Sequence, residues 1–284
     1  MFTGYTDQTV DVFWGIRFNN DRAWFAEHKQ EFQDAVMAPT KALAAELYDW
    51  FQADYPDLHL NLHISRIYRD ARRLFGRGPL NDHIWFSFQN AIENRGEAPC
   101  FWFQVGADGY GCGAGWWMPA ASGVQLRRLL DHDPARGEKL LRNLDAQNSF
   151  TLSGPAYARP KGHAAEPLGR LYNLRSFSLE SMHPFDARSS SAALTDWVKD
   201  GFRFLLPYYQ LFEQAYGMVD RAYFFFSPFR KTSDRPTRIR KPPNSFRSVS
   251  ASARWASSAP PTAHTAPAAA AGQTAGQTIW RFLI

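Results

Sequence analysis

The chain has 284 residues, of which 45% are hydrophobic and 15% aromatic, so most of it can fold around a sizeable core. Its formal net charge of +5 arises in residues 227–284, which hold nine Lys and Arg against one acid, whereas residues 1–226 hold 23 against 26. The overall basicity is therefore no argument for nucleic-acid binding by the main part of the chain. No stretch reaches the ~18 apolar residues of a membrane span, and we expect no membrane partner.

Two cysteines, Cys100 and Cys112, are too few for a disulfide scaffold and favour a reducing compartment. If Asp108 and Gly109 form a two-residue hairpin turn, Cys112 lies opposite Val105, roughly 16 Å along the strand from Cys100. That separation is beyond disulfide reach. We therefore expect a cytoplasmic protein with free thiols.

The first predicted elements are two helices. Asn19, Asn20 and Asp21 are suitable N-caps, and apolar residues then recur at helical spacing from Trp24 until Pro39 ends the pattern. Pro39 itself is a suitable first-turn residue, so a second helix is predicted to begin there.

Clustered strands follow. Alternating or continuous apolar runs predict strands at residues 58–64, 85–90, 100–106, 110–118 and 149–154. Further helices are predicted from Ser122 to about Leu130, from Asp133-Pro134 through Leu144, and from Ala192 to about Ala215, with a kink at Pro207 and a stop at Gly217. Because the strands do not alternate with helices, we predict an α+β fold: an antiparallel sheet packed with flanking helices, forming a single domain over residues 1–226.

The composition changes abruptly after Phe226. Of the 58 residues in 227–284, 32 are Ala, Ser, Pro or Thr, and the remaining apolar residues show no helix or strand period. Such a segment buries too little apolar surface to offset its ordering entropy. We predict a disordered basic tail, with a frameshifted C-terminus as the open alternative; nucleic acid is not expected as a partner except through this tail.

The densest charge in the chain is a run of five arginines around one acid, Asp70. The arginines are Arg66, Arg69, Arg72, Arg73 and Arg77. Guanidinium groups match phosphate and carboxylate geometry, so one interpretation is a pocket for a small anionic ligand. The other is a structural salt-bridge hub, with Asp70 and acids elsewhere pairing the arginines. The glycine-rich turn from Gly76 to Pro79 favours the ligand pocket.

Three further side chains are candidates for a site with these arginines. His83 follows Asp82 at a strand entrance, so a general base with a carboxylate beside it is one hypothesis, with Asp70 as a second catalytic candidate. Lys161, after Pro160, is a candidate ligand contact. No metal and no cofactor are expected, since the two histidines of the first predicted strand lie about 13 Å apart on one face.

Four glycines alternate from Gly109 to Gly115 within the predicted hairpin. Their spacing is not that of a nucleotide-binding loop that opens a helix. Glycines at every second position instead leave one strand face bare, so that an aromatic side chain or another backbone can lie on it.

Several blocks in this sequence resemble a known family. They are FTGY near the start, FNNDRAWFAEHKQEF, RIYRDAR, the hairpin with GWWMP, and PKGH. Together they resemble, over about residues 1–216, an uncharacterised family of bacterial and fungal proteins, the domain-of-unknown-function family 2461. Its hallmark is Arg-x-x-Arg-Asp-x-Arg, then Phe-Ser, then an Asp/Asn-Lys pair before an aromatic residue, and the residues from Arg66 to Arg72 match the first half.

The second half of that motif differs here. Arg73-Leu74 stands in place of Phe-Ser, and Asn81-Asp82-His83 replaces the acid-lysine pair before Trp85. The resemblance implies no established activity. Three hypotheses therefore remain: a binding module for a phosphorylated or carboxylated ligand, an enzyme acting on such a ligand with His83 as base, and a structural interaction protein. The sequence leaves the oligomeric state open.

Overall fold

The computed structural model describes residues 1–74, 76–90, 96–162 and 165–226, except for the side chains of Arg73 and of residues 220–226. Its centre is a six-stranded antiparallel sheet in the order β1-β2-β3-β4-β6-β5. The strands are β1 (Asn61–Ile64), β2 (His83–Gln89), β3 (Cys100–Gly106), β4 (Gly109–Trp116), β5 (Thr151–Ser153) and β6 (Phe177–His183). The predicted α+β class is confirmed, whereas the tail predicted at 227–284 lies outside the described residues.

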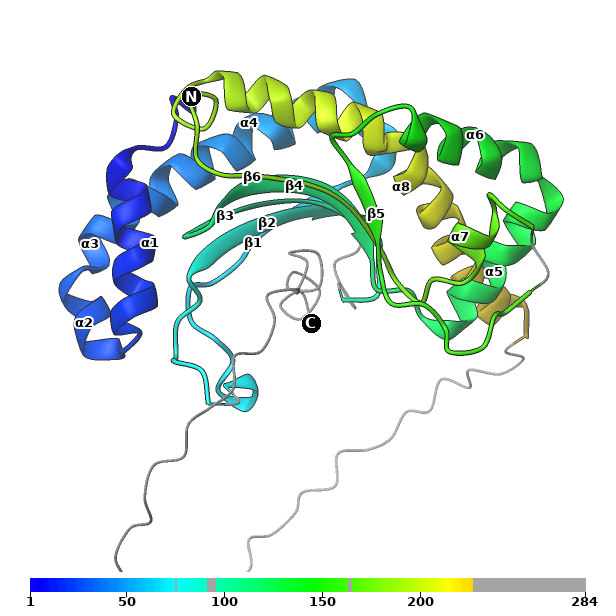
Figure 1. Cartoon of the computed structure of the whole chain (residues 1–284), viewed down its shortest axis with the longest axis horizontal. Coiled ribbons are helices and arrows are strands. Elements are labelled where there is room, and N and C mark those ends of the chain that lie inside the picture. The colour runs from blue at the N-terminus through cyan, green and yellow to red at the C-terminus, as the bar shows by residue number, and fades with distance from the viewer. Residues whose placement is uncertain (75, 91–95, 163–164, 227–284) are drawn as a thin grey trace, which may run out of the picture.

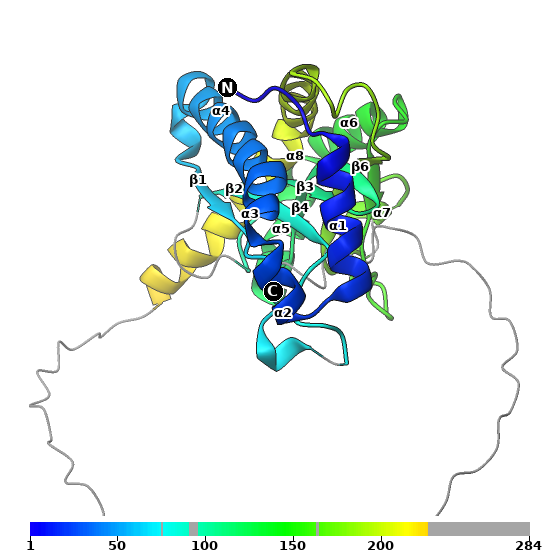
Figure 2. The same cartoon turned by 90° about the vertical axis from the view of Figure 1, so that its left-hand side faces the viewer.

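The sheet is curved, and α4 and α8 lie across its convex face, while α1 to α3 stand at one end and α5 to α7 at the other (Figure 1). Figure 2 views the end of the sheet at which α1 to α3 stand. The α-helices are α1 (Asp7–Asn19), α2 (Arg22–Glu27), α3 (Lys29–Phe32), α4 (Ala38–Asp54), α5 (Ala120–His132), α6 (Pro134–Asp145), α7 (Gly169–Tyr172) and α8 (Ala193–Phe226). The other helical segments are a π-helical turn (Gln33–Met37) and two 3₁₀ turns (Pro56–Leu58 and Ala71–Arg73).

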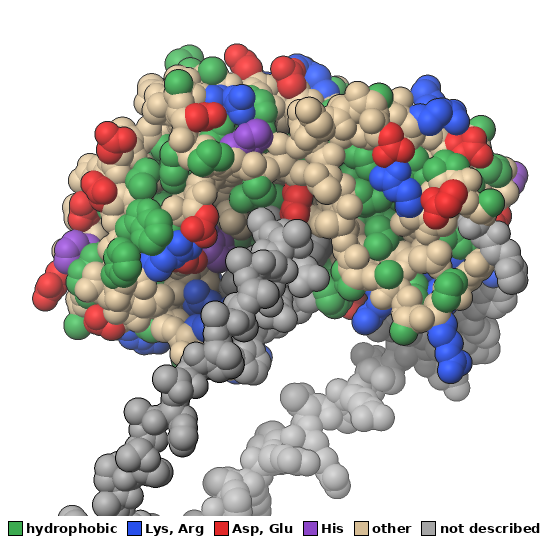
Figure 3. Space-filling model, in the orientation of Figure 1, with side chains coloured by type: hydrophobic (Ala, Val, Ile, Leu, Met, Phe, Trp, Pro, Cys, Tyr) green, Lys and Arg blue, Asp and Glu red, His purple; other side chains and the backbone are tan. Residues whose placement is uncertain are grey.

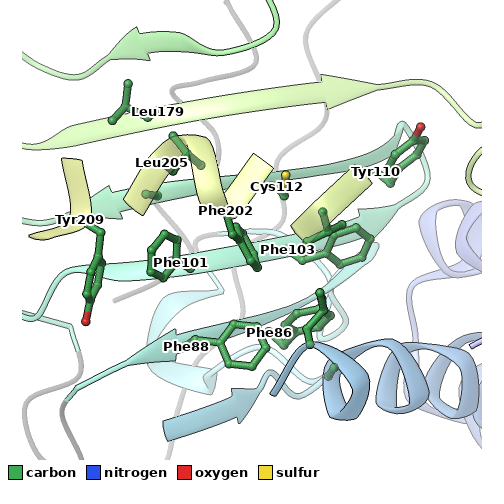
Figure 4. Packing of buried hydrophobic residues seen from close by; sticks show 14 of the residues in the cluster. Phe86, Phe88, Phe101, Phe103, Tyr110, Cys112, Leu179, Phe202, Leu205 and Tyr209 are labelled. Atoms are coloured by element: carbon green, nitrogen blue, oxygen red, sulfur yellow. The ribbon is translucent and has the colours of Figure 1, made fainter. Parts of the chain in front are cut away.

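The convex face of the sheet carries the hydrophobic core. Every second residue of β2 and β3 is an apolar side chain that points toward the helices (Figure 4). The Phe101 ring lies 5.1 Å from that of Phe202 and 4.5 Å from that of Tyr209, both on α8. Full burial of each such side chain contributes about 1.5–3 kcal/mol. The intervening residues of the same strands point to the concave face.

The helix α1 was not predicted from the sequence. It begins after Thr6, whose backbone N–H donates to Thr9 Oγ1 at 3.1 Å, and it ends at Asn20, which is left-handed with φ of 32°. Its β-branched residues, among them Thr9 and Val12, have low helix propensity, and their burial against the core overrides it. Pro39 lies in the first turn of α4, as predicted, where no N–H is needed.

The β3–β4 hairpin turns one residue earlier than predicted. Gly106 pairs with Gly109, so Ala107 and Asp108 form the two-residue turn. Gly109 has φ of +127°, and a side chain there would lie 2.1 Å from the carbonyl oxygen of His183. The neighbouring strand β6 therefore requires this glycine at the start of β4.

The new register places Cys112 opposite Phe103, not Val105 as predicted. Cys100 pairs with Gly115, and both cysteines are buried and free, so the expectation of free thiols is confirmed.

The larger differences from the predictions concern β1, α8 and β6. β1 is only four residues long because the chain forms a 3₁₀ turn up to Leu58 and His59 is left-handed with φ of 48°. α8 continues through Gly217 to Phe226, so Gly217 does not end it. The strand β6 was missed, although Phe177 and Leu179 alternate with polar residues as a half-buried strand should.

Candidate functional site

A cavity of about 250 Å³ opens where the β3–β4 hairpin meets α1 and the loop between β1 and β2. We call it the arginine pocket. Its charged and titratable lining consists of Arg17, Arg69, Arg77, Asp82, His83 and Asp108. Basic, acidic and histidine side chains lie together on the left flank of the arch in Figure 3. The pocket brings residues that are far apart in the sequence to one end of the sheet.

Arg17 of α1 is held by two carboxylates. Its Nε donates to Asp82 Oδ2 at 2.6 Å, and its two terminal nitrogens donate to Asp108 at 2.7 and 2.6 Å. The hydrogen bond to Asp108, assisted by Asp82, raises the pKa of Arg17, and the same bond lowers the pKa of Asp108. Arg17 therefore joins α1 to the hairpin turn and to the start of β2.

Asp82 also contacts His83. The Nδ1 atom of His83 lies 3.2 Å from Asp82 Oδ1, and the imidazole is buried. Burial alone would raise the pKa of Asp82, but its hydrogen bonds with His83 and Arg17 together hold that pKa well below the usual range. The Asp82 carboxylate thus stays charged and fixes one side of the imidazole.

The loop between β1 and β2 is fastened to the end of α1. The side chain of Asn20 donates to Leu80 O at 3.1 Å and accepts from Leu80 N at 2.9 Å. The same carbonyl accepts from Arg69 Nε at 2.8 Å, and Arg69 N donates to Pro79 O. These bonds place the half-buried Arg69 side chain at the pocket wall.

Arg69 and Arg77 present like charges to the same cavity. The pKa of Arg69 is lowered, first by burial and second by the charge of Arg77, while Asp82 opposes the shift. Their shared environment thus disfavours two positive charges, and an anion in the cavity would reduce that cost.

The structure brings Arg69, Arg77 and His83, among the predicted site residues, into this pocket. Arg66 is exposed, and the side chain of Arg73 lies outside the described part of the chain. Asp70 and Arg72 form an ion pair at 2.6 Å with side-chain exposures of 37% and 86%, away from the pocket lining.

Lys161 lies elsewhere. Its Nζ is 5.0 Å from the centre of the Tyr157 ring, and its backbone N–H donates to Asn173, near α7 at the other end of the sheet. Its predicted contact with a ligand of the arginine cluster therefore has no geometric support.

Sequence reasoning did not identify Arg17 and Asp108 as site residues. Arg17 belongs to the unpredicted helix, and Asp108 was interpreted only as a turn residue. Whether a pocket forms at the tip of a hairpin depends on which segments pack against it, and no local pattern in this sequence carries that information.

Two other properties concern the described residues alone. Among them, no group of three or more His, Cys, Asp or Glu side chains could hold a metal ion. No helix in the described ranges combines the length and apolar character needed to cross a membrane.

Comparison with known proteins gives one family. The family model described as "Conserved hypothetical protein (DUF2461)" matches residues 8–211. The match includes every pocket residue named above. A search of curated proteins finds no match.

Proposed function

Since the chain belongs to the conserved hypothetical protein family DUF2461, we infer its function from the pocket: it binds a small phosphorylated or carboxylated ligand there. The observation that carries this proposal is that Arg69 and Arg77 line one cavity and that the charge of Arg77 lowers the pKa of Arg69. Three arginines and two carboxylates line the cavity, so its lining carries one more positive than negative charge. An anionic group between them would form charge-assisted hydrogen bonds with guanidinium donors.

The volume of the cavity limits the ligand. At about 250 Å³ it lies below the ~300–1,000 Å³ of most small-molecule sites. We therefore expect the pocket itself to hold one phosphate or carboxylate group with a few attached atoms.

A second function, an enzyme acting on that ligand, is favoured by the contact between Asp82 and His83 in the same cavity. In this proposal Asp82 orients the imidazole, His83 removes a proton, and the arginines stabilise the developing negative charge. The third hypothesis, a structural interaction protein with an internal salt-bridge hub, is supported by the double ion pair of Arg17.

The test of binding compares two arginines of one loop. Arg69→Gln alters the pocket, and Arg72→Gln, the matched control, removes an exposed charge outside it. We expect phosphate, at constant ionic strength against chloride, to raise the melting temperatures of the wild type and Arg72→Gln by several degrees, because ligand at ~100 times its Kd adds about 2.7 kcal/mol. Arg69→Gln should show only the small general effect of excluded salts. Equal shifts in all three proteins would reject the pocket.

The enzyme hypothesis needs a separate measurement. Each compound that binds is incubated with the protein and followed by NMR for chemical change. Conversion by the wild type, lost in His83→Gln while binding remains, supports a general base. If no bound compound changes, the binding function stands alone.

A further inference from the structure

One row of side chains crosses the concave face of all six strands. In strand order it consists of His63, Ser87, Trp102, Gly113, Glu180 and Thr151. Their direction follows from the alternation of each strand, because Phe101, Phe103 and Leu179 belong to the core under the helices. The described helices lie on the convex face or at the ends of the sheet (Figure 1). This row therefore lies on the second face of the sheet, opposite the hydrophobic core, and it contains several polar side chains.

Gly113 leaves a gap in the middle of this row, and Trp102 extends into it. A side chain at Gly113 would lie 2.6 Å from Cζ2 and 2.8 Å from Cε2 of the Trp102 ring, so the indole covers the strand β4. The prediction that a glycine here makes room for an aromatic side chain is confirmed at Gly113, whereas the side chain of Met182 lies over Gly111. Trp102 is 1% exposed, and among the described residues its Nε1 has no hydrogen-bond partner. Because buried N–H groups are nearly always hydrogen-bonded, this donor is a suitable contact for an acceptor atom of a ligand.

Glu180 flanks the same gap from β6. It is 9% exposed and accepts a hydrogen bond from Ser178 Oγ at 2.9 Å. Burial raises the pKa of its carboxyl group, which Ser178 opposes only in part. Because β3 and β6 are two strand spacings apart, the backbones of Trp102 and Glu180 are separated by about 10 Å. The indole N–H and the carboxyl group are thus two buried polar groups on neighbouring parts of one face.

The row is continuous with the arginine pocket. In the next row along the strands, Gln104 pairs with Gly111, and Gly111 pairs with Met182. Gln104 and Met182 both line the pocket. Successive rows on one face are about 7 Å apart, so a ligand anchored in the pocket comes level with Trp102 and Glu180 if it extends about 7 Å past Gln104. Met182, which packs against Trp102, borders this path.

We propose that the ligand is an anionic polyol, a sugar phosphate or a sugar acid, with a hydroxyl group that bridges Trp102 and Glu180. The anionic end rests on the proposed function of the arginine pocket. A hydroxyl group accepts a hydrogen bond from the indole N–H and donates one to the carboxyl group, whereas an alkyl chain satisfies neither. Sites built to bind a hydroxyl group discriminate strongly against analogues that lack it.

The test measures affinity by calorimetry for matched probes. Glycerol 3-phosphate is compared with propyl phosphate, gluconate with hexanoate, and inorganic phosphate reports the anion site alone. We expect at least one hydroxylated probe to bind the wild type tenfold more tightly than its alkyl partner. Trp102→Phe and Glu180→Gln should each reduce this ratio below threefold and leave phosphate affinity within twofold. Trp197→Phe, on the other side of the sheet, is the control that keeps the full ratio.

The outcomes separate this inference from the proposed function. Equal affinity for hydroxylated and alkyl probes overturns the polyol and leaves the anion pocket intact. Absence of binding by every probe overturns both. Adenosine monophosphate binding more tightly than either polyol would identify a nucleotide and overturn the inference as well. If Glu180→Gln does not fold, Trp102→Phe decides the question, because phenylalanine keeps an aromatic ring and removes only the N–H donor.

Discussion

At the residue scale, Asp82 is the pocket carboxylate whose charge should matter most for stability, because it is largely buried and contacts both Arg17 and His83. Its pKa is held below the usual range, so its contribution to stability is fully present above the unfolded pKa of about 3.9 and is lost as the pH falls toward the folded pKa. Asp82→Asn should therefore cost about 1–3 kcal/mol at pH 7 and much less near pH 2. Urea unfolding across this pH range measures the difference.

Asp70→Asn is the matched control for this prediction. Asp70 pairs with Arg72, whose side chain is 86% exposed, and an exposed pair of this kind contributes about 0–1 kcal/mol. A larger loss in Asp70→Asn than in Asp82→Asn would support a structural salt-bridge hub centred on Asp70. An unchanged pH dependence in Asp82→Asn would show that its charge does not support the fold.

At the element scale, the loop that carries Arg69 depends on the last turn of α1. Asn20→Gly keeps the left-handed backbone but removes both hydrogen bonds to Leu80, so we expect a loss of about 1–3 kcal/mol and faster amide exchange at Leu80. Phosphate affinity should fall too, since Arg69 shares the Leu80 carbonyl.

The control for this prediction is Asn19→Ala. Alanine is chosen because glycine at a helical position would itself destabilise α1. The Asn19 side chain donates to Gly15 O within its own helix. Amide exchange at Leu80 should be unchanged in this variant. If both variants speed exchange equally, the loop is held by other contacts.

The elements that the sequence predicted well are those whose signals are local. Asp133 caps α6 by accepting from Arg136 N, and the boundaries of β3 were predicted correctly. The elements that it missed depend on tertiary packing: the β-branched helix α1, and β6, which is inserted between β4 and β5. The pocket residues likewise divide into those with a local sequence signal and those that depend on tertiary packing. The density of arginines indicated Arg69 and Arg77, whereas Arg17 became visible only when α1 was placed beside the hairpin.

At the scale of the whole molecule, the hydrophobic core extends from Phe2 to Ala215. The predicted domain boundary at 226 is testable by deletion of residues 227–284. Because every core residue in the described part of the chain is retained, we expect the melting temperature to change by less than about 2 °C, which corresponds to well under 1 kcal/mol.

Deletion from Phe204 onward serves as the comparison, because it removes Tyr209 and Phe212, which are buried against the sheet. This shorter chain should fail to unfold cooperatively. A chain ending at 226 that also loses its cooperative transition would show that the domain needs residues beyond α8.

The sheet ends in its shortest strands: β1 has four residues and β5 has three, whereas the four inner strands have seven or eight. An outer strand presents free backbone donors and acceptors that another chain can use for cross-β growth, and a short one offers few. β5 pairs with β6 and so covers the backbone hydrogen-bonding groups on the outer side of that strand. If it detached, the strand containing Phe177 and Leu179 would become an edge, and partial opening at this side would be the first step toward aggregation.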